Sequence, residues 1–403
     1  MKVAIYLPGL GEAFEDISVV RYAELLANEI DQNNNVASIS YKIKVEKVKY
    51  ATDENCSSNK VSIISNTNGS EKTEYIIYDF CYSALLTEEF KSRNILMKSF
   101  LLLWVVITKF PLLILRIFSF KKGFSLKFRL QSLWAIFCFL IIALLGITLI
   151  PGSINLLKEV SHTHTNLLHL FHYKWMIRLV QLINTYSKWA VAIVAIIFSL
   201  TPSSKDVFTS LATEFVAANY YLEMGERKQI ILGHLQKLLE HISETEGEET
   251  KIHFHSYSFG SVIAIDFLFP YGNILANRTK QMTEAMITIG CPYDFFSTYY
   301  NGYFTERVDD LKGIKWYNVY SIVDALGSNF RDNNDSIEST YSFINGFMPL
   351  NFQYELNHLS KSSFSGVIMF YFIRAHKLYW DKTSTSESCI RLFYTKMHED
   401  GLI

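Results

Sequence analysis

The chain has 403 residues, enough for one large domain or two ordinary ones, and its 38 basic and 39 acidic residues leave a net charge of −1. This balance excludes a global electrostatic attraction to nucleic acid. Charged residues make up only 19% of the chain and aromatic residues 15%, and the mean hydropathy is +0.13. Such a composition is unusual for a soluble globular protein and indicates contact with a membrane.

The cysteines indicate a reducing compartment. There are five of them, an odd number, and they are widely spaced with no CxxC pair: Cys56, Cys81, Cys138, Cys291 and Cys389. We therefore interpret them as free thiols rather than as a disulfide framework. The apolar run at the N-terminus is broken by Pro8 and Gly9, which makes it too short for a signal peptide.

The first 90 residues alternate between strand-like and helix-like patterns. A helix is expected over residues 17–30, where Val19, Tyr22, Leu26 and Ile30 recur at helical spacing. Runs of β-prone residues predict strands at 3–7, 36–45, 61–64 and 75–81. Turn-forming residues at 65–70 separate the last two runs. Strands that alternate with helices predict an α/β sheet.

The composition changes sharply over residues 94–204, where three apolar segments follow one another. The segment at 133–157 is uncharged for long enough to cross a bilayer, which takes about 20 residues. The segment at 179–200 carries only Lys188. Lys109 interrupts the segment at 100–118, and a charge at the centre of a bilayer costs about 2.5 kcal/mol or more.

If the residues before and after this insertion form one domain, the number of crossings must be even. We therefore expect the second and third segments to cross the membrane and the first to lie in the interface or to re-enter the bilayer. Basic residues cluster before the second segment, at Lys121, Lys122, Lys127 and Arg129. Such clusters favour the cytoplasmic side, which would place the flanking residues in the cytoplasm.

Four histidines lie between the two segments that we expect to cross: His162, His164, His169 and His172. They could ligate a metal, but no cysteine is near them and Glu159 is the only acidic residue close by. We interpret them as neutral residues at a membrane interface and expect no metal site.

The most informative stretch of the chain lies at residues 251–265, Lys-Ile-His-Phe-His-Ser-Tyr-Ser-Phe-Gly-Ser-Val-Ile-Ala-Ile. A β-prone segment ends at Ser258, and an apolar, helix-competent segment follows at once. Small residues, Ser256 and Gly260, stand two positions before and after this serine. The pattern is typical of a nucleophile elbow, with Ser256 in place of the usual first glycine.

An elbow serine needs an acid and then a histidine, in that order along the chain. Strands are expected at 285–290 and 314–321, and Asp324 follows the second of them, with Asp294 as its rival. For the base we select His376, which follows the apolar run at 367–373, with His358 as the alternative. His253 and His255 lie on the elbow strand itself and are interpreted as sheet residues.

Two backbone N–H groups would complete the site as an oxyanion hole. One is the N–H of Phe259, directly after the serine, and the other is that of Leu10 in Pro8-Gly9-Leu10-Gly11. Glycines on both sides of Leu10 would let this backbone approach a substrate.

On these residues the chain resembles the α/β-hydrolase superfamily, in particular its lipases and serine esterases. The resemblance covers about residues 1–90 and 205–400, and it implies a mostly parallel sheet with helices on both faces. The implied domain organisation is an N-terminal hydrolase part at 1–93, an inserted membrane region at 94–204 and a C-terminal hydrolase part at 205–403.

The resulting hypothesis is an integral membrane serine hydrolase that cleaves phospholipid or acylglycerol esters through Ser258, Asp324 and His376. Its partners would be the bilayer and a lipid-like substrate, without nucleic acid. A thioesterase would use the same residues. The alternative function is a catalytically inactive hydrolase fold that acts as a membrane scaffold or a membrane-disrupting effector. No P-loop, CxxC pair or dinucleotide fingerprint occurs in the chain, so no cofactor is expected.

Overall fold

The described residues of the computed structural model fall into two compact units. One contains the described residues up to Leu85 and from Gly225 onward, and the other those between 86 and 224. Apart from isolated positions between 97 and 111, the described stretches are 2–10, 17–34, 39–51, 56–67, 69–92, 216–223, 225–272, 275–300, 302–308, 310–311, 313–322, 324, 326–331, 338–344, 346–354, 376, 378–380 and 389–403.

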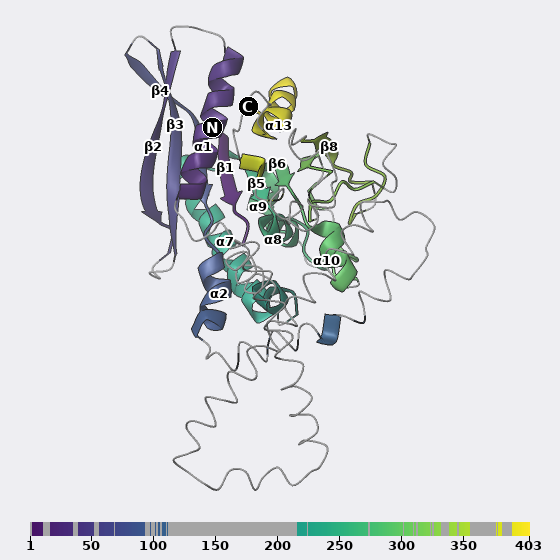
Figure 1. Ribbon diagram of the computed structural model, residues 1–403. Helices are drawn as coiled ribbons and strands as arrows, with labels where there is room; N and C mark the ends of the chain where they lie inside the picture. Colours follow the sequence, from purple (N-terminus) through teal and green to yellow (C-terminus); the bar gives the residue numbers. More distant parts are fainter. Residues whose placement is uncertain are drawn as a thin grey trace, which may run out of the picture. The chain divides into compact units, whose positions relative to one another are not determined.

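The first unit is built on an eight-stranded sheet with the order β2-β3-β4-β1-β5-β6-β7-β8 (Figure 1). The strands are β1 (Lys2–Leu7), β2 (Ile39–Lys49), β3 (Ser57–Thr67), β4 (Ser70–Asp79), β5 (Lys251–Tyr257), β6 (Thr283–Ile289), β7 (Lys315–Tyr320) and β8 (Leu350–Gln353). Only the β2–β3 and β3–β4 pairs are antiparallel, and the other neighbours run parallel. The sequence-based prediction of a mostly parallel α/β sheet is confirmed.

Helices cover both faces of this sheet. They are α1 (Ile17–Asn34), α2 (Ser83–Ser92), α7 (Glu226–Glu246), α8 (Phe259–Leu268), α9 (Asn277–Met282), α10 (Tyr293–Tyr299) and α13 (Cys389–Glu399), with a short 3-10 helix η2 (Leu378–Trp380). Side chains alternate along β5, so His255 and Phe254 point to opposite faces. His255 contacts Tyr22 of α1 and Phe393 of α13, whereas Phe254 contacts Phe267 of α8. Helices α1 and α13 therefore cover one face, and α8 covers the other.

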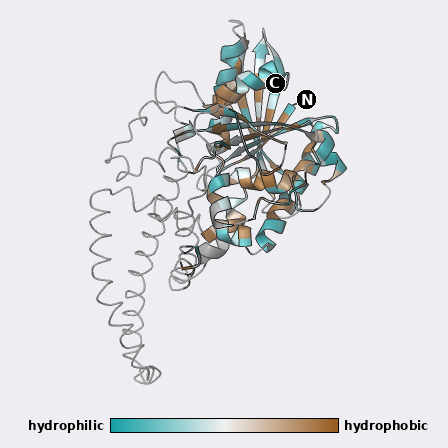
Figure 2. Cartoon of the chain, turned by 90° about the vertical axis from the view of Figure 1, so that its right-hand side faces the viewer, coloured by the Kyte–Doolittle hydropathy of each residue, from teal (hydrophilic) through white to brown (hydrophobic). Residues whose placement is uncertain are grey.

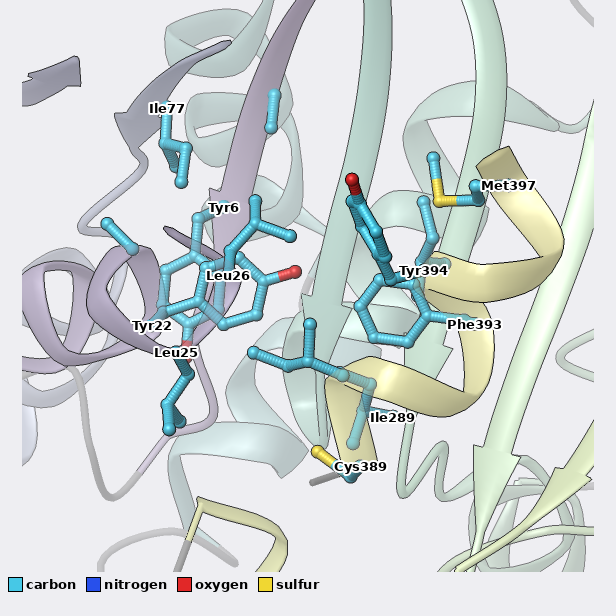
Figure 3. Packing of buried hydrophobic residues seen from close by; sticks show 14 of the residues in the cluster. Tyr6, Tyr22, Leu25, Leu26, Ile77, Ile289, Cys389, Phe393, Tyr394 and Met397 are labelled. Atoms are coloured by element: carbon cyan, nitrogen blue, oxygen red, sulfur yellow. The ribbon is translucent and has the colours of Figure 1, made fainter. Parts of the chain in front are cut away.

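Apolar side chains from α1, α13 and the strands between them form the core of the first face (Figure 3). Tyr22 and Leu26 of α1 meet Phe393 and Met397 of α13 over this part of the sheet, and all four are at most 1% exposed. Figure 2 shows the same partition, with hydrophobic residues along the central strands and hydrophilic residues on the outer helical surfaces. Burial of this apolar surface is the main force that holds the helices against the sheet.

A buried chain of hydrogen bonds crosses the first face of the sheet. Tyr22 bonds to Nδ1 of His255, and the Tyr75 hydroxyl lies 3.2 Å from Nε2 of His255 and 2.6 Å from Nδ1 of His253. The chain ends at Glu284, whose carboxylate lies 3.0 Å from Nε2 of His253. The prediction that both histidines are sheet residues is confirmed.

The carboxylate sets the direction of every bond in this chain. The hydrogen bond from His253 is the main cause that lowers the pKa of Glu284 to about 2, so Glu284 is an acceptor and His253 carries its proton on Nε2. Nδ1 of His253 then accepts from Tyr75, whose oxygen accepts from Nε2–H of His255. Nδ1 of His255 accepts from Tyr22. Neutral histidines therefore satisfy each buried donor and acceptor in the chain.

Most expected elements are present with shifted ends. The helix expected at 17–30 extends to Asn34, and the strand expected at 36–45 is β2, which continues to Lys49. The acidic stretch at 244–249, whose composition is typical of a solvated loop, lies with its first half in the last turn of α7. Helices α2, α7, α9, α10 and α13 and strand β8 were not predicted from the sequence. The apolar run at 367–373, which could form a further strand, lies outside the described residues.

The structure leaves the membrane prediction open. Among the described helices, none combines the length and apolar character that a bilayer crossing requires. The segments at 133–157 and 179–200 lie outside the described residues, as do the boundaries expected at 94 and 204. Lys109 of the second unit is buried and forms an ion pair with Glu223.

Acid should unfold this protein through the histidines of the buried chain. Burial is the main cause that lowers the pKa values of His253 and His255 below 6.5, so below that pH the unfolded chain takes up protons that the folded chain does not. The contribution of these histidines to the free energy of unfolding is therefore fully present above about pH 6.5 and is lost as the pH decreases from there. The contribution of Glu284 is lost at lower pH, between about 4.5 and 2. Urea midpoints measured from pH 8 down to pH 2 test both losses.

The variant His255→Phe should be less stable at pH 8, by about 1–3 kcal/mol, because Tyr22 and Tyr75 lose their partner. It should also lose stability less steeply below pH 6.5. His398→Gln, on the exposed side of α13, is the control and should keep the native slope. If His255→Phe lost stability with pH as steeply as the native protein, the buried histidines would not be the cause of the acid sensitivity.

Candidate active site

The site lies where four neighbouring strands end. β1, β5, β6 and β7 are parallel and adjacent, so their carboxyl ends meet at one edge of the sheet. The segments that leave this edge begin at Pro8, Ser258, Gly290 and Ser321. β4 and β5 lie on opposite sides of β1. Ligands of α/β sheets bind at such an edge, close to the point where the connections diverge.

Ser258 occupies a strained turn between β5 and α8. Its φ is 52° and its ψ is −125°, a conformation that L-residues rarely adopt. The Ser258 N–H donates to the carbonyl of Ile289 at 2.9 Å, and its own carbonyl accepts from the N–H of Ser261 at 3.0 Å. These bonds tie the turn to β6 and to the first turn of α8. A non-glycine residue at such a turn costs about 1–3 kcal/mol, so neighbouring contacts must hold it.

The residues two positions from Ser258 explain how the turn packs. A Cβ at Gly260 would lie 2.2 Å from the carbonyl oxygen of Leu7 and 2.7 Å from that of Pro8. Only glycine fits there, because α8 touches the end of β1. Ser256 is fully buried, and its hydroxyl donates to the carbonyl of Ile287 at 2.8 Å. The departure from glycine at this position is therefore accommodated within the sheet.

The structure brings Ser258, His376 and Asp324 into one hydrogen-bonded row. The Ser258 hydroxyl lies 2.6 Å from Nε2 of His376, and Nδ1 of His376 lies 2.9 Å from Oδ2 of Asp324. Because an ionised carboxylate only accepts, His376 carries its proton on Nδ1 and Nε2 accepts from the serine. Asp324 is fully buried and His376 is 6% exposed, whereas Ser258 is only partly buried. Exposure thus increases from the acid to the hydroxyl.

Several groups hold Asp324 in place. Its Oδ1 accepts from the N–H of Leu326 at 2.8 Å, and its Oδ2 accepts from the hydroxyl of Tyr379 at 2.8 Å as well as from His376. A Cβ at Gly327 would lie 2.5 Å from Oδ2 of Asp324. The carboxylate is therefore enclosed by donors and by a glycine that leaves room for it.

The loop after β1 contacts the Ser258 turn as the oxyanion prediction requires. A Cβ at Gly9 would lie 3.1 Å from Cβ of Ser258, and the Tyr82 hydroxyl donates to the carbonyl of Pro8 at 2.6 Å. Leu10 is described and is 5% exposed. Phe259 is the first residue of α8, so its N–H belongs to the positive end of a helix dipole. Binding of an oxyanion by Leu10 and Phe259 stays a prediction.

The alternatives to these residues are placed elsewhere or lie outside the described residues. Asp294 is in the first turn of α10, and its Oδ1 accepts from the hydroxyl of Tyr341. His358 lies outside the described residues, as do the histidines between 162 and 172. In the part of the chain that the structure describes, no group of His, Cys, Asp and Glu side chains could hold a metal ion.

Sequence reasoning missed the residues that support His376 and Asp324. The Tyr257 ring stacks on the His376 imidazole with centroids 5.3 Å apart, and its hydroxyl donates to the carbonyl of His376. Gly290 has a φ of 58°, and a Cβ there would lie 3.1 Å from the imidazole of His376. The glycine directly after a strand was a usable signal for a close approach. Nothing in the sequence indicated the orientation of Tyr257 or Tyr379.

Comparison with known proteins adds no relative: no family model, curated protein or solved structure matches the chain.

The Gly260→Ala variant tests whether the turn depends on contact between α8 and the end of β1. The new methyl group would overlap two carbonyl oxygens of the backbone, so we expect a loss of about 3 kcal/mol or more in the free energy of unfolding. Gly233→Ala is the matched control, because nothing lies within 4 Å of that Cβ in helix α7. The control should gain up to about 1 kcal/mol. Equal stabilities of the two variants in urea would refute the packing argument.

Proposed function

We propose that this chain is a serine hydrolase of the α/β-hydrolase kind and that it cleaves lipid esters. The observation that carries the proposal is the row of hydrogen bonds from Ser258 through His376 to Asp324. It combines a partly exposed hydroxyl on a strained turn with a histidine in the tautomer of a general base and a buried carboxylate. The mostly parallel sheet with helices on both faces supports the same assignment.

In the proposed reaction Nε2 of His376 takes the proton of Ser258 while Oγ attacks the carbonyl carbon of an ester. Asp324 holds Nδ1–H and stabilises the imidazolium that forms. The N–H groups of Leu10 and Phe259 would donate to the oxyanion. The imidazolium then protonates the leaving alcohol, which gives an acyl-serine. Water, deprotonated by His376, cleaves the acyl-serine and restores the hydroxyl.

Tyr257 adds to this mechanism through its position. Its ring faces the imidazole with an interplanar angle of 22°, so the positive charge that forms on His376 would lie against an aromatic face. The hydroxyl of Tyr257 also holds the backbone of His376. The base would thus be oriented by contacts on its ring and on its main chain.

The lipid character of the substrate is inferred from the sequence of residues 94–204. Two uncharged or nearly uncharged segments, 133–157 and 179–200, would anchor the enzyme in the bilayer. An acyl chain could then reach Ser258 without crossing water. Both flanking parts of the chain contribute to one sheet, which supports an even number of crossings.

A fluorophosphonate probe tests the nucleophile. The native protein should form a covalent adduct at Ser258, because attack on phosphorus with loss of fluoride needs the same base. Ser258→Ala should abolish labelling, and His376→Gln should slow it by about 10³-fold or more. Ser261→Ala removes a buried hydroxyl in the first turn of α8, three residues after Ser258. The probe should label this variant as it labels the native protein. A native protein that resists labelling would favour the inactive scaffold.

Vesicles test the substrate class. Native protein added to phospholipid vesicles that contain diacylglycerol should release free fatty acid, whereas Ser258→Ala should release none while binding the vesicles equally well. Lipidomics of the exposed membranes would identify the ester that is lost. Leakage of vesicle contents with equal lipid profiles for both proteins would instead indicate membrane disruption without hydrolysis.

A further inference from the structure

Tyr379 is a buried tyrosine that touches the acid of the site and has no part in the mechanism above. It lies in η2, three residues after His376, and is 1% exposed. Its hydroxyl donates to Oδ2 of Asp324 at 2.8 Å and accepts from the N–H of Ser321 at 2.9 Å. The phenol therefore links the end of β7 to the carboxylate.

The two donors on Oδ2 of Asp324 compete for the same oxygen. His376 approaches it at 2.9 Å and Tyr379 at 2.8 Å. A hydrogen bond to a carboxylate stabilises its charge and so reduces its attraction for another proton. Tyr379 thus weakens the pull of Asp324 on the imidazolium of His376, while it prevents the carboxylate from rotating away.

The protonation state of Tyr379 is secure. Burial, reinforced by the charge of Asp324, raises the pKa of the Tyr379 hydroxyl well above its ordinary value of 10. Its ring packs against Tyr257 and Tyr354, and a Cβ at Gly290 would lie 3.0 Å from it. The phenol therefore remains a donor, in a fixed position, across the working pH range.

We propose that Tyr379 is a positioning residue that sets the basicity of the Asp324–His376 pair by sharing Oδ2 of Asp324 with the imidazole. The inference rests on the proposed hydrolase function and deepens it, because it names the residue that regulates the pH at which Ser258 becomes reactive. Among the described residues, the titratable side chains of Tyr257 and Tyr379 contact this pair, and the hydroxyl of Ser258 bonds to His376.

The test is the rate constant for inactivation by a fluorophosphonate as a function of pH, measured on the full chain. In Tyr379→Phe the carboxylate loses a donor and holds the imidazolium more strongly, so Ser258 should need a higher pH to react. The acidic limb should move up by about half a pH unit or more, and the plateau rate should fall by about tenfold because the carboxylate is less well oriented.

Tyr317→Phe is the matched control. Tyr317 also lies in the core of the first face, and its hydroxyl donates to a carboxylate, that of Asp400, at 2.6 Å. This variant removes the same kind of bond away from the site and should keep the native limb. An equal shift in both variants would show a general effect of destabilisation and would overturn the proposal.

A second variant keeps the hydroxyl and covers the case in which Tyr379→Phe does not fold. Site-specific 3,5-difluorotyrosine at position 379 is a stronger donor, so its acidic limb should move to lower pH, opposite to that of phenylalanine. If the probe labelled the native protein but neither substitution moved the acidic limb of the pH profile, the role of Tyr379 alone would be overturned. No labelling of the native protein would overturn the hydrolase function together with this role.

Discussion

The contact between the end of β1 and the start of α8 is the constraint on which the site depends. Gly260 allows the helix to touch the carbonyls of Leu7 and Pro8, and this contact holds Ser258 in a backbone conformation that it would otherwise leave. The same contact places the loop of Pro8 and Gly9 against Ser258. One close approach therefore positions both the hydroxyl and the backbone that would receive the oxyanion.

Two of the polar systems of the sheet have different parts to play. The chain from Tyr22 to His253 is buried and ends at the partly exposed Glu284, whose carboxylate accepts from both His253 and Lys2. The low pKa of Glu284 fixes the protons of this chain in one direction. The row from Asp324 to Ser258 is enclosed at its acid and partly exposed at its hydroxyl. A buried network of the first kind stabilises and specifies the fold. A row of the second kind ends in a partly exposed hydroxyl, which the proposed hydrolysis requires.

The sequence was sufficient for the elements whose signal is local. Steric need made Gly260 and Ser258 recognisable, and the order of acid and histidine led to Asp324 and His376, because parallel strands bring their ends together. Helix α13 could also have been predicted, because Ile390, Phe393, Tyr394 and Met397 recur at helical spacing. All four side chains are buried. The role of Tyr379 could not have been predicted, because its hydroxyl bonds to a residue 55 positions away in the sequence and no local pattern indicates that contact.

The strain at Ser258, taken together with the hydrogen-bonded row that begins there, favours the proposed hydrolase over an inactive scaffold. A fold that serves only as a scaffold gains nothing from a non-glycine residue at a positive φ, which costs about 1–3 kcal/mol against a typical total stability of 5–15 kcal/mol. It gains equally little from a fully buried carboxylate with its own tyrosine donor, because an apolar pair of the same shape would be as stable or more so. Both features have a clear use when Ser258 must lose its proton to His376. Positive φ at Glu306 and Phe330 and the buried pair of Asp266 and Arg307 show that such features also occur away from the site. Their combination in one hydrogen-bonded row at Ser258 is what supports the proposed acyl transfer.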